Sequence, residues 1–263
     1  MKITLSKFSI GLSVFGLCLF APYTLAEVIA KTYPVKNFSE FASGGNVSVE
    51  IAQDGSEYLR VEADAEVMSR VKVDQSGERV SVWIKHEGGF FNWFGQGNDP
   101  VRVVLRVKQL NYLEITGGGR ATVGDLQVEK FHAHASGAGN INFAVLNAEF
   151  LKVDLSGAAN VRVNRVNSQE QKFELSGASK VEIQAPSNTQ DLHVEASGAS
   201  NFEARELTSK RARLGASGAS HAEARVTEKL NANASGASRI DYYGNPEVKS
   251  DSSGASQVSA RKD

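Results

Sequence analysis

The tetrapeptide Ser176-Gly177-Ala178-Ser179 decides the fold of this chain, because it belongs to a series of eight similar copies. The intervals between successive copies are 20, 20, 20, 21, 20, 18 and 18 residues. A nearly fixed period of this length is typical of stacked repeat architectures, in which each repeat packs mainly against its two neighbours. The copies start at Thr116, Ser136, Ser156, Ser176, Ser197, Ser217, Ser235 and Ser253.

Apolar and polar residues alternate on both sides of each copy. Leu151, Val153 and Leu155 precede the third copy, and Val161 and Val163 follow it. Alternation with a period of two predicts a β-strand on each side of the motif. The sequence therefore predicts an all-β protein. Its residues 116–263 should form a β-solenoid, similar to a parallel β-helix, of about seven to eight short coils.

Glycine is the second residue of every copy. Because glycine adopts bent or positive-φ backbone geometry at little cost, it suits a sharp turn that is repeated at one place in every coil. We interpret these glycines as structural corners of the solenoid. They are Gly117, Gly137, Gly157, Gly177, Gly198, Gly218, Gly236 and Gly254.

Residues 1–26 have the features of a secretory signal peptide. Lys2 and Lys7 precede an apolar run from Ile10 to Phe20, and Thr24-Leu25-Ala26 supplies the small residues of a cleavage site. The only cysteine, Cys18, lies in this segment, where lipid attachment is the alternative to cleavage after Ala26. We expect an exported protein, periplasmic or on the cell surface, with no transmembrane span in the mature chain and no disulfide.

Residues 27–115 form a predicted N-terminal β-rich segment. Alternating runs such as 46–51 and 79–84 are separated by glycine-containing turn signals, and no long helical pattern competes with them. A loop at residues 88–100 interrupts these strands with four large aromatic residues flanked by glycines. These aromatics are either a plug over an open end of the sheet or an exposed contact for a partner. They are Phe90, Phe91, Trp93 and Phe94.

Charge and motifs exclude several functions. The formal net charge of the chain is -1, which does not favour nucleic-acid binding. No zinc-protease, phosphate-loop or nucleophile-elbow motif is present. The histidine pair His132 and His134 shares one strand face, and a column containing Glu182 and Glu203 could collect calcium, yet neighbouring basic residues should neutralise these acids. We predict no catalytic residue, no metal site and no cofactor.

The Ser-Gly-Ala-Ser series behind a signal peptide and a β-rich leader resembles one bacterial family, the putative auto-transporter adhesin, head GIN domain. The resemblance covers roughly residues 30–260. It implies a β-solenoid-like fold and an exported location. The family has no agreed catalytic motif, so the resemblance implies no active-site residues.

These observations favour an exported, non-enzymatic binding or adhesin-like module of the cell envelope. Its candidate partners are a glycan, another envelope component or a protein. An open solenoid end exposes unpaired backbone groups, so either a homo-oligomer through this end or docking of a partner there is also expected. The alternatives are a polysaccharide-active enzyme that uses an acidic groove, and a purely structural envelope scaffold.

Overall fold

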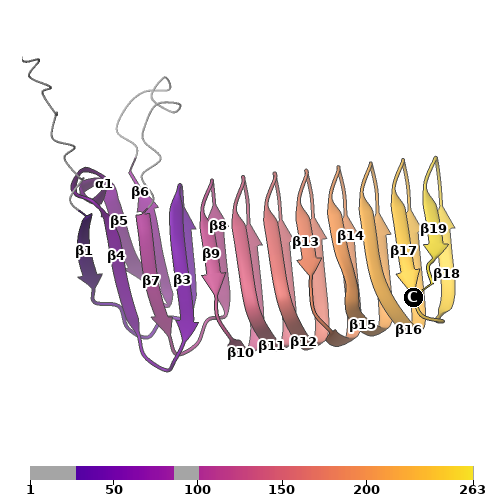
Figure 1. Cartoon of the computed structure of the whole chain (residues 1–263), viewed down its shortest axis with the longest axis horizontal. Coiled ribbons are helices and arrows are strands. Elements are labelled where there is room, and N and C mark those ends of the chain that lie inside the picture. The colour runs from indigo at the N-terminus through magenta and orange to yellow at the C-terminus, as the bar shows by residue number, and fades with distance from the viewer. Residues whose placement is uncertain (1–27, 86–100, 263) are drawn as a thin grey trace, which may run out of the picture.

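The computed structural model describes residues 28–85 and 101–262. The predicted signal peptide, residues 1–26, lies outside this part of the chain. Strands account for 70% of the structure and helix for 3%, and the strands wind into a β-solenoid of about 7 turns. The coils line up along one axis, with their sharp corners in a row along one edge (Figure 1). The predicted fold class is confirmed.

Strands β8 to β19 build the repeat region. Each strand pairs in parallel with the strand one coil before and one coil after it, without a shift of register except between β15 and β16. Their bounds are β8 Tyr112–Thr116, β9 Arg120–Val123, β10 Leu126–Ala135, β11 Asn140–Leu155, β12 Asn160–Leu175, β13 Lys180–Ile183, β14 Ser187–Ala196, β15 Asn201–Ala216, β16 His221–Ala234, β17 Arg239–Tyr243, β18 Glu247–Ser252 and β19 Gln257–Ala260.

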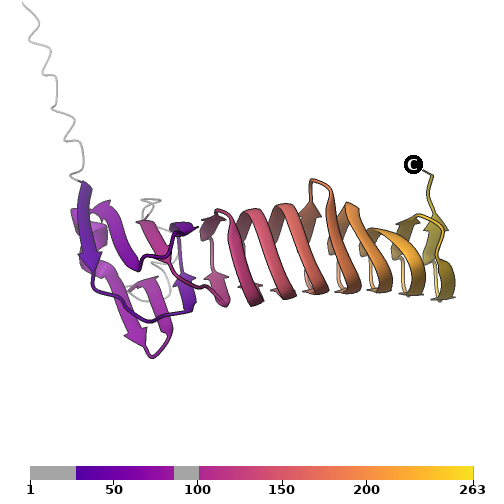
Figure 2. The same ribbon diagram turned by 90° about the horizontal axis from the view of Figure 1, so that it is seen from below.

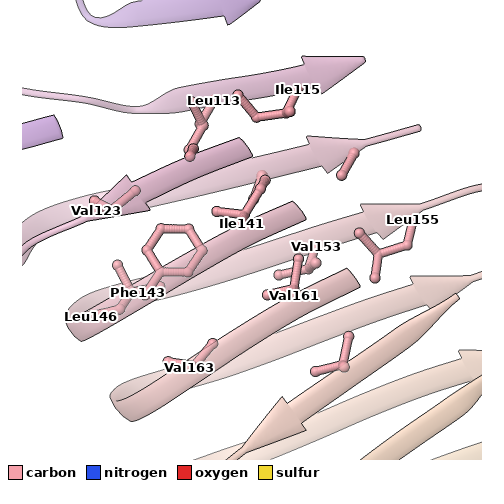
Figure 3. Close-up of a cluster of buried hydrophobic side chains, with 14 of the residues drawn as sticks. Leu113, Ile115, Val123, Ile141, Phe143, Leu146, Val153, Leu155, Val161 and Val163 are labelled. Atoms are coloured by element: carbon pink, nitrogen blue, oxygen red, sulfur yellow. The ribbon is translucent and has the colours of Figure 1, made fainter. Parts of the chain in front are cut away.

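The interior is built from columns of apolar residues at equivalent positions of successive coils. Ile115, Ala135, Leu155 and Leu175 occupy equivalent register positions on four successive coils, and each is buried. The strands before and after a corner both direct apolar side chains into the interior, as those with Leu155 and Val161 do in Figure 3. Parallel pairing therefore converts the period-two pattern of each repeat into one continuous apolar core.

The stack begins earlier in the chain than residue 116. Strand β2 (Glu40–Gly44) pairs in parallel with β8, and β3 (Val47–Gln53) pairs in parallel with β9. Between them Gly45 has a φ of 89°, so residues 40–53 form a coil with its own glycine corner. The predicted boundary at residue 116, between a β-rich segment and the solenoid, remains a proposal. The hydrogen-bonded ladder of parallel strands runs across it.

Chain order and spatial order differ at this end. Strands β6 (Arg79–Ile84) and β7 (Val101–Val107) pair in parallel with β2 and β3, on the side opposite to β8 and β9. They form an outer coil, and the predicted aromatic loop connects them. The chain thus forms the outer coil after the coil of β2 and β3, although the outer coil comes first along the stack. The regular period of the later repeats does not reveal this order.

Antiparallel strands cover the outer coil. Strand β4 (Tyr58–Asp64) pairs with β7, β1 (Val28–Tyr33) pairs with β4, and β5 (Val71–Ser76) pairs with β6. Helix α1 (Ala65–Arg70) joins β4 to β5 and buries Val67. This mixed layer forms the end of the stack at the left of Figure 2, while β18 and β19 form the other end of the described stack.

Candidate functional site

The corner edge of the solenoid is built by backbone packed on backbone. All eight predicted corner glycines have a φ between 70° and 77°, a region that favours glycine. A Cβ on Gly177 would lie 2.4 Å from the carbonyl oxygen of Gly157 in the preceding coil. The neighbouring Ala178 N–H donates to that same oxygen over 2.7 Å. This edge has no room for side chains at the glycine positions.

The last serine of the motif has a different role from the first. The side chains of Ser179, Ser200 and Ser220 are buried. The Oγ of Ser200 donates to the carbonyl oxygen of Ser197 at 2.6 Å, and Ser220 Oγ does the same to Ser217 at 2.8 Å. Each of these buried hydroxyls thus bridges the two ends of its own corner with a hydrogen bond. The repeat pattern marks both serines but does not separate these roles.

The flat faces carry columns of opposite charges. Asp154 accepts hydrogen bonds at its Oδ2 from Lys152 Nζ at 2.8 Å and shares a 2.6 Å contact with His132 Nε2. Burial acts to raise the pKa of Asp154, but these hydrogen bonds outweigh it and hold the pKa below its usual value. Lys172 pairs similarly with Glu174 at 2.7 Å. The acids on this face are therefore neutralised by their neighbours.

The opposite face is also self-neutralised. Glu182 lies 3.3 Å from Arg162, and Glu203 lies 2.7 Å from Lys180. Hydrogen bonding to Gln184, followed by the charges of Lys180 and Arg162, lowers the pKa of Glu182. In the described part of the chain, no group of three or more His, Cys, Asp or Glu side chains is arranged to hold a metal ion.

A long groove follows the rounded edge of the coils. Its volume is about 990 Å³. Seven of its sixteen lining residues are Asn or Gln, four are Ser or Thr, and three carry a charge. The lining residues are Gln109, Gln127, Val128, Glu129, Asn147, Ala148, Glu149, Asn167, Ser168, Gln169, Asn188, Thr189, Gln190, Thr208, Lys210 and Thr227.

The amides of the groove come from one register column. Asn147 on β11 lies beside Asn167 on β12, which lies beside Asn188 on β14. Gln127 and Thr208 extend the same column on either side. This surface is not among the sequence predictions, because these residues lie outside the columns next to the motif. Its signal is present, since these residues recur at intervals of 20, 20, 21 and 20, like the motif itself.

The predicted aromatic contacts, Phe90, Phe91, Trp93 and Phe94, lie outside the described residues. The strands that flank them are placed. Ile84 ends β6 and Val101 begins β7, with Trp83 in register beside Gly44 and Val101 beside Val47. The connecting segment therefore starts and ends where the next coil has its glycine corner.

No helix among the placed residues is long and apolar enough to cross a membrane. No curated protein matches this chain. Solved structures share its fold at low identity. A protein named a putative adhesin from Parabacteroides merdae superimposes with a TM-score of 0.79 at 16% identity, covering 90% of this chain and 97% of that one. A protein named a putative lipid binding protein from Parabacteroides distasonis gives 0.76 at 18% identity, covering 89% and 97%.

A family model matches most of the repeat region and the coils before it. The match extends over residues 37–246, which includes the coil of β2 and β3 and seven of the eight motif copies up to Ser235. The family's name suggests a non-enzymatic protein that is exported or at the surface. The chain belongs to the family described as "Putative auto-transporter adhesin, head GIN domain".

Proposed function

We propose that the chain is an exported, non-enzymatic binding module of the cell envelope. The observation that carries the proposal is the pairing of the acids on its flat faces. Glycoside hydrolysis needs two carboxyl groups, one of them protonated to donate to the leaving group. Asp154 instead has a lowered pKa between Lys152 and His132, and Glu174 lies against Lys172. Such a face is suited to binding rather than to acid–base chemistry.

The shape of the molecule supports the same proposal. Stacked coils present long, regular surfaces, and repeat proteins use such surfaces for extended contacts. The four aromatic residues Phe90, Phe91, Trp93 and Phe94 remain proposed partner contacts. The strands before and after them in the chain, β6 and β7, lie toward one end of the stack. At the other end, β18 has exposed side chains throughout, with Val248 38% exposed. Self-association through a solenoid end is part of the proposal.

A binding screen run beside a turnover assay tests this function. The mature protein is applied to a glycan array and to an immobilised envelope fraction, while the same glycans are assayed for newly formed reducing ends. We expect retention on at least one surface and no new reducing ends. Release of product would overturn the non-enzymatic proposal, and absence of retention on every surface would overturn the binding proposal.

A further inference from the structure

The groove along the rounded edge is lined by amides of which only one pair is hydrogen-bonded to each other among the described residues. Asn167 Nδ2 donates to Asn147 Oδ1 at 3.1 Å, which closes one rung of the column. Elsewhere in the described chain, the side-chain amides of Gln127 and Asn188 have no hydrogen-bond partner. In a ladder that serves stability alone, each amide would donate to the next. Most of the hydrogen-bonding capacity of these exposed amides is therefore available to a ligand in the groove.

The small number of charged residues in the groove favours an uncharged ligand. Glu129 and Glu149 lie toward its N-terminal part and Lys210 toward its C-terminal part, while the remaining lining is uncharged. The two flat faces differ from the groove, because their charged side chains form ion pairs such as that between Lys172 and Glu174. A polyanion would find one cation here, and lipid tails would find mainly amides and hydroxyls. A neutral ligand rich in hydroxyl groups suits this lining.

The repeat of the groove indicates a linear ligand. Equivalent amides recur once per coil, about 4.8 Å apart along the stack. The strands of the groove already pair in parallel with the coils on either side, as Asn147 does with Asn167. A peptide therefore cannot add to the groove as an extra strand, and only side chains can recognise the ligand. A polymer with a repeating pattern of hydroxyls can use the same contact in each coil.

We infer that the groove binds an extended, uncharged polysaccharide lying along the solenoid axis. Asn147, Asn167 and Asn188 contact its hydroxyl groups from one side, and Gln169 and Gln190 contact them from the other. This inference rests on the proposed binding function and adds its site and ligand class. Because every coil contributes a similar contact, affinity rises with the length of the sugar chain until the groove is filled.

Affinity electrophoresis of the mature protein tests the inference. The gels contain dextran, laminarin or mannan as uncharged polymers, alginate as a charged one, or none. We expect at least one uncharged polymer to retard the protein more strongly than alginate does. The triple variant Asn147→Ala, Asn167→Ala and Asn188→Ala should weaken this retardation at least about tenfold.

A matched triple variant controls for the loss of three asparagines. The substitutions Asn142→Ala, Asn164→Ala and Asn201→Ala remove amides that do not line the groove. The gel retardation of this variant should equal that of the wild-type protein. Circular dichroism of both variants checks that the β-fold is retained. Equal weakening by both triples, or none by either, would overturn the groove assignment and leave the binding function standing.

Four further outcomes test the inference and the proposed function separately. Retention on the envelope fraction, or on lipid vesicles alone, without retardation by any uncharged polymer would overturn the ligand class only. Stronger retardation by alginate would do the same. No retention on any material would overturn both proposals together. Among laminarin oligosaccharides that bind, equal affinity at all lengths would contradict contact along several coils.

Discussion

The two edges of each coil solve the same stacking problem in different ways. At the corner edge, the backbones of Gly157 and Gly177 lie so close that a single Cβ would strike a carbonyl oxygen at 2.4 Å. At the rounded edge, strands such as β11 and β12 pass through without a glycine, and side chains such as Asn147 and Asn167 point outward from the stack. Close backbone contact requires glycine at the corner edge. The rounded edge lacks this contact, so its positions can carry side chains that bind a ligand.

The largest expected effect is at the corner. Gly177→Ala places a side chain at positive φ and against the Gly157 carbonyl, and should lower the free energy of unfolding by about 2–5 kcal/mol. Urea unfolding followed by circular dichroism measures this. Gly118→Ala is the matched control, because it has no atom within 4 Å of the added Cβ and no positive φ. Equal losses in both variants would show that backbone contact does not define this edge.

A buried amide behind the rounded edge gives the next effect. Gln171 is fully buried, and neither of its amide atoms has a hydrogen-bond partner among the placed residues. In the adjacent coils the same position is Leu151 and Leu192. Because an unsatisfied buried amide costs about 1–3 kcal/mol, Gln171→Leu should raise the free energy of unfolding by about 1–2 kcal/mol.

Thermal and urea unfolding measure the Gln171 effect. The exposed Gln190→Leu serves as its control and should change stability by no more than about 0.5 kcal/mol. A loss of stability in Gln171→Leu would mean that the amide has a partner within the core. The rounded edge would then depend on polar contacts inside as well as outside.

The flat face between the edges should respond to acid. The pKa of Asp154 is lowered in the folded state, so its contribution to stability is complete above the unfolded value of about 3.9 and is lost as the pH falls through the lower folded value. Asp154→Asn should therefore be less stable than the wild type at pH 7, and the gap should close below about pH 4.

Unfolding curves between pH 2 and pH 7 measure the Asp154 effect. Glu206→Gln is the control, since Glu206 is exposed and has no ion pair among the residues that the structure places. A gap between wild type and Asp154→Asn that stays constant over this range would show that the hydrogen bonds to Lys152 and His132 do not select the ionised carboxylate.

The smallest effect on stability is expected in the groove. Asn167→Ala removes the one closed rung, a hydrogen bond of 3.1 Å to Asn147, and should cost at most about 1 kcal/mol. Differential scanning calorimetry measures this beside Asn142→Ala. A cost comparable to that of Gly177→Ala would mean that the amide column is a structural device, and the contrast between the two edges would fail.

The repeat region could be predicted from sequence because its determinants are local. Alternation in residues such as Leu151, Val153 and Leu155 selects the inward face, and glycine selects the corner. Both signals recur at the same interval, so the parallel register follows from the period alone. In this region the sequence by itself determined the coils, the core columns and the corner edge.

Only the tertiary structure decided what happens where the period breaks. The coil of β6 and β7 stacks outside β2 and β3 although it follows them in the chain, because pairing partners are chosen by exposed strand edges and not by chain order. The polar surface along the rounded edge also depends on three dimensions. The amides of Gln127, Asn147, Asn167 and Asn188 form one surface only because parallel pairing aligns residues that lie about 20 positions apart, and the groove along it needs the curvature of the coil.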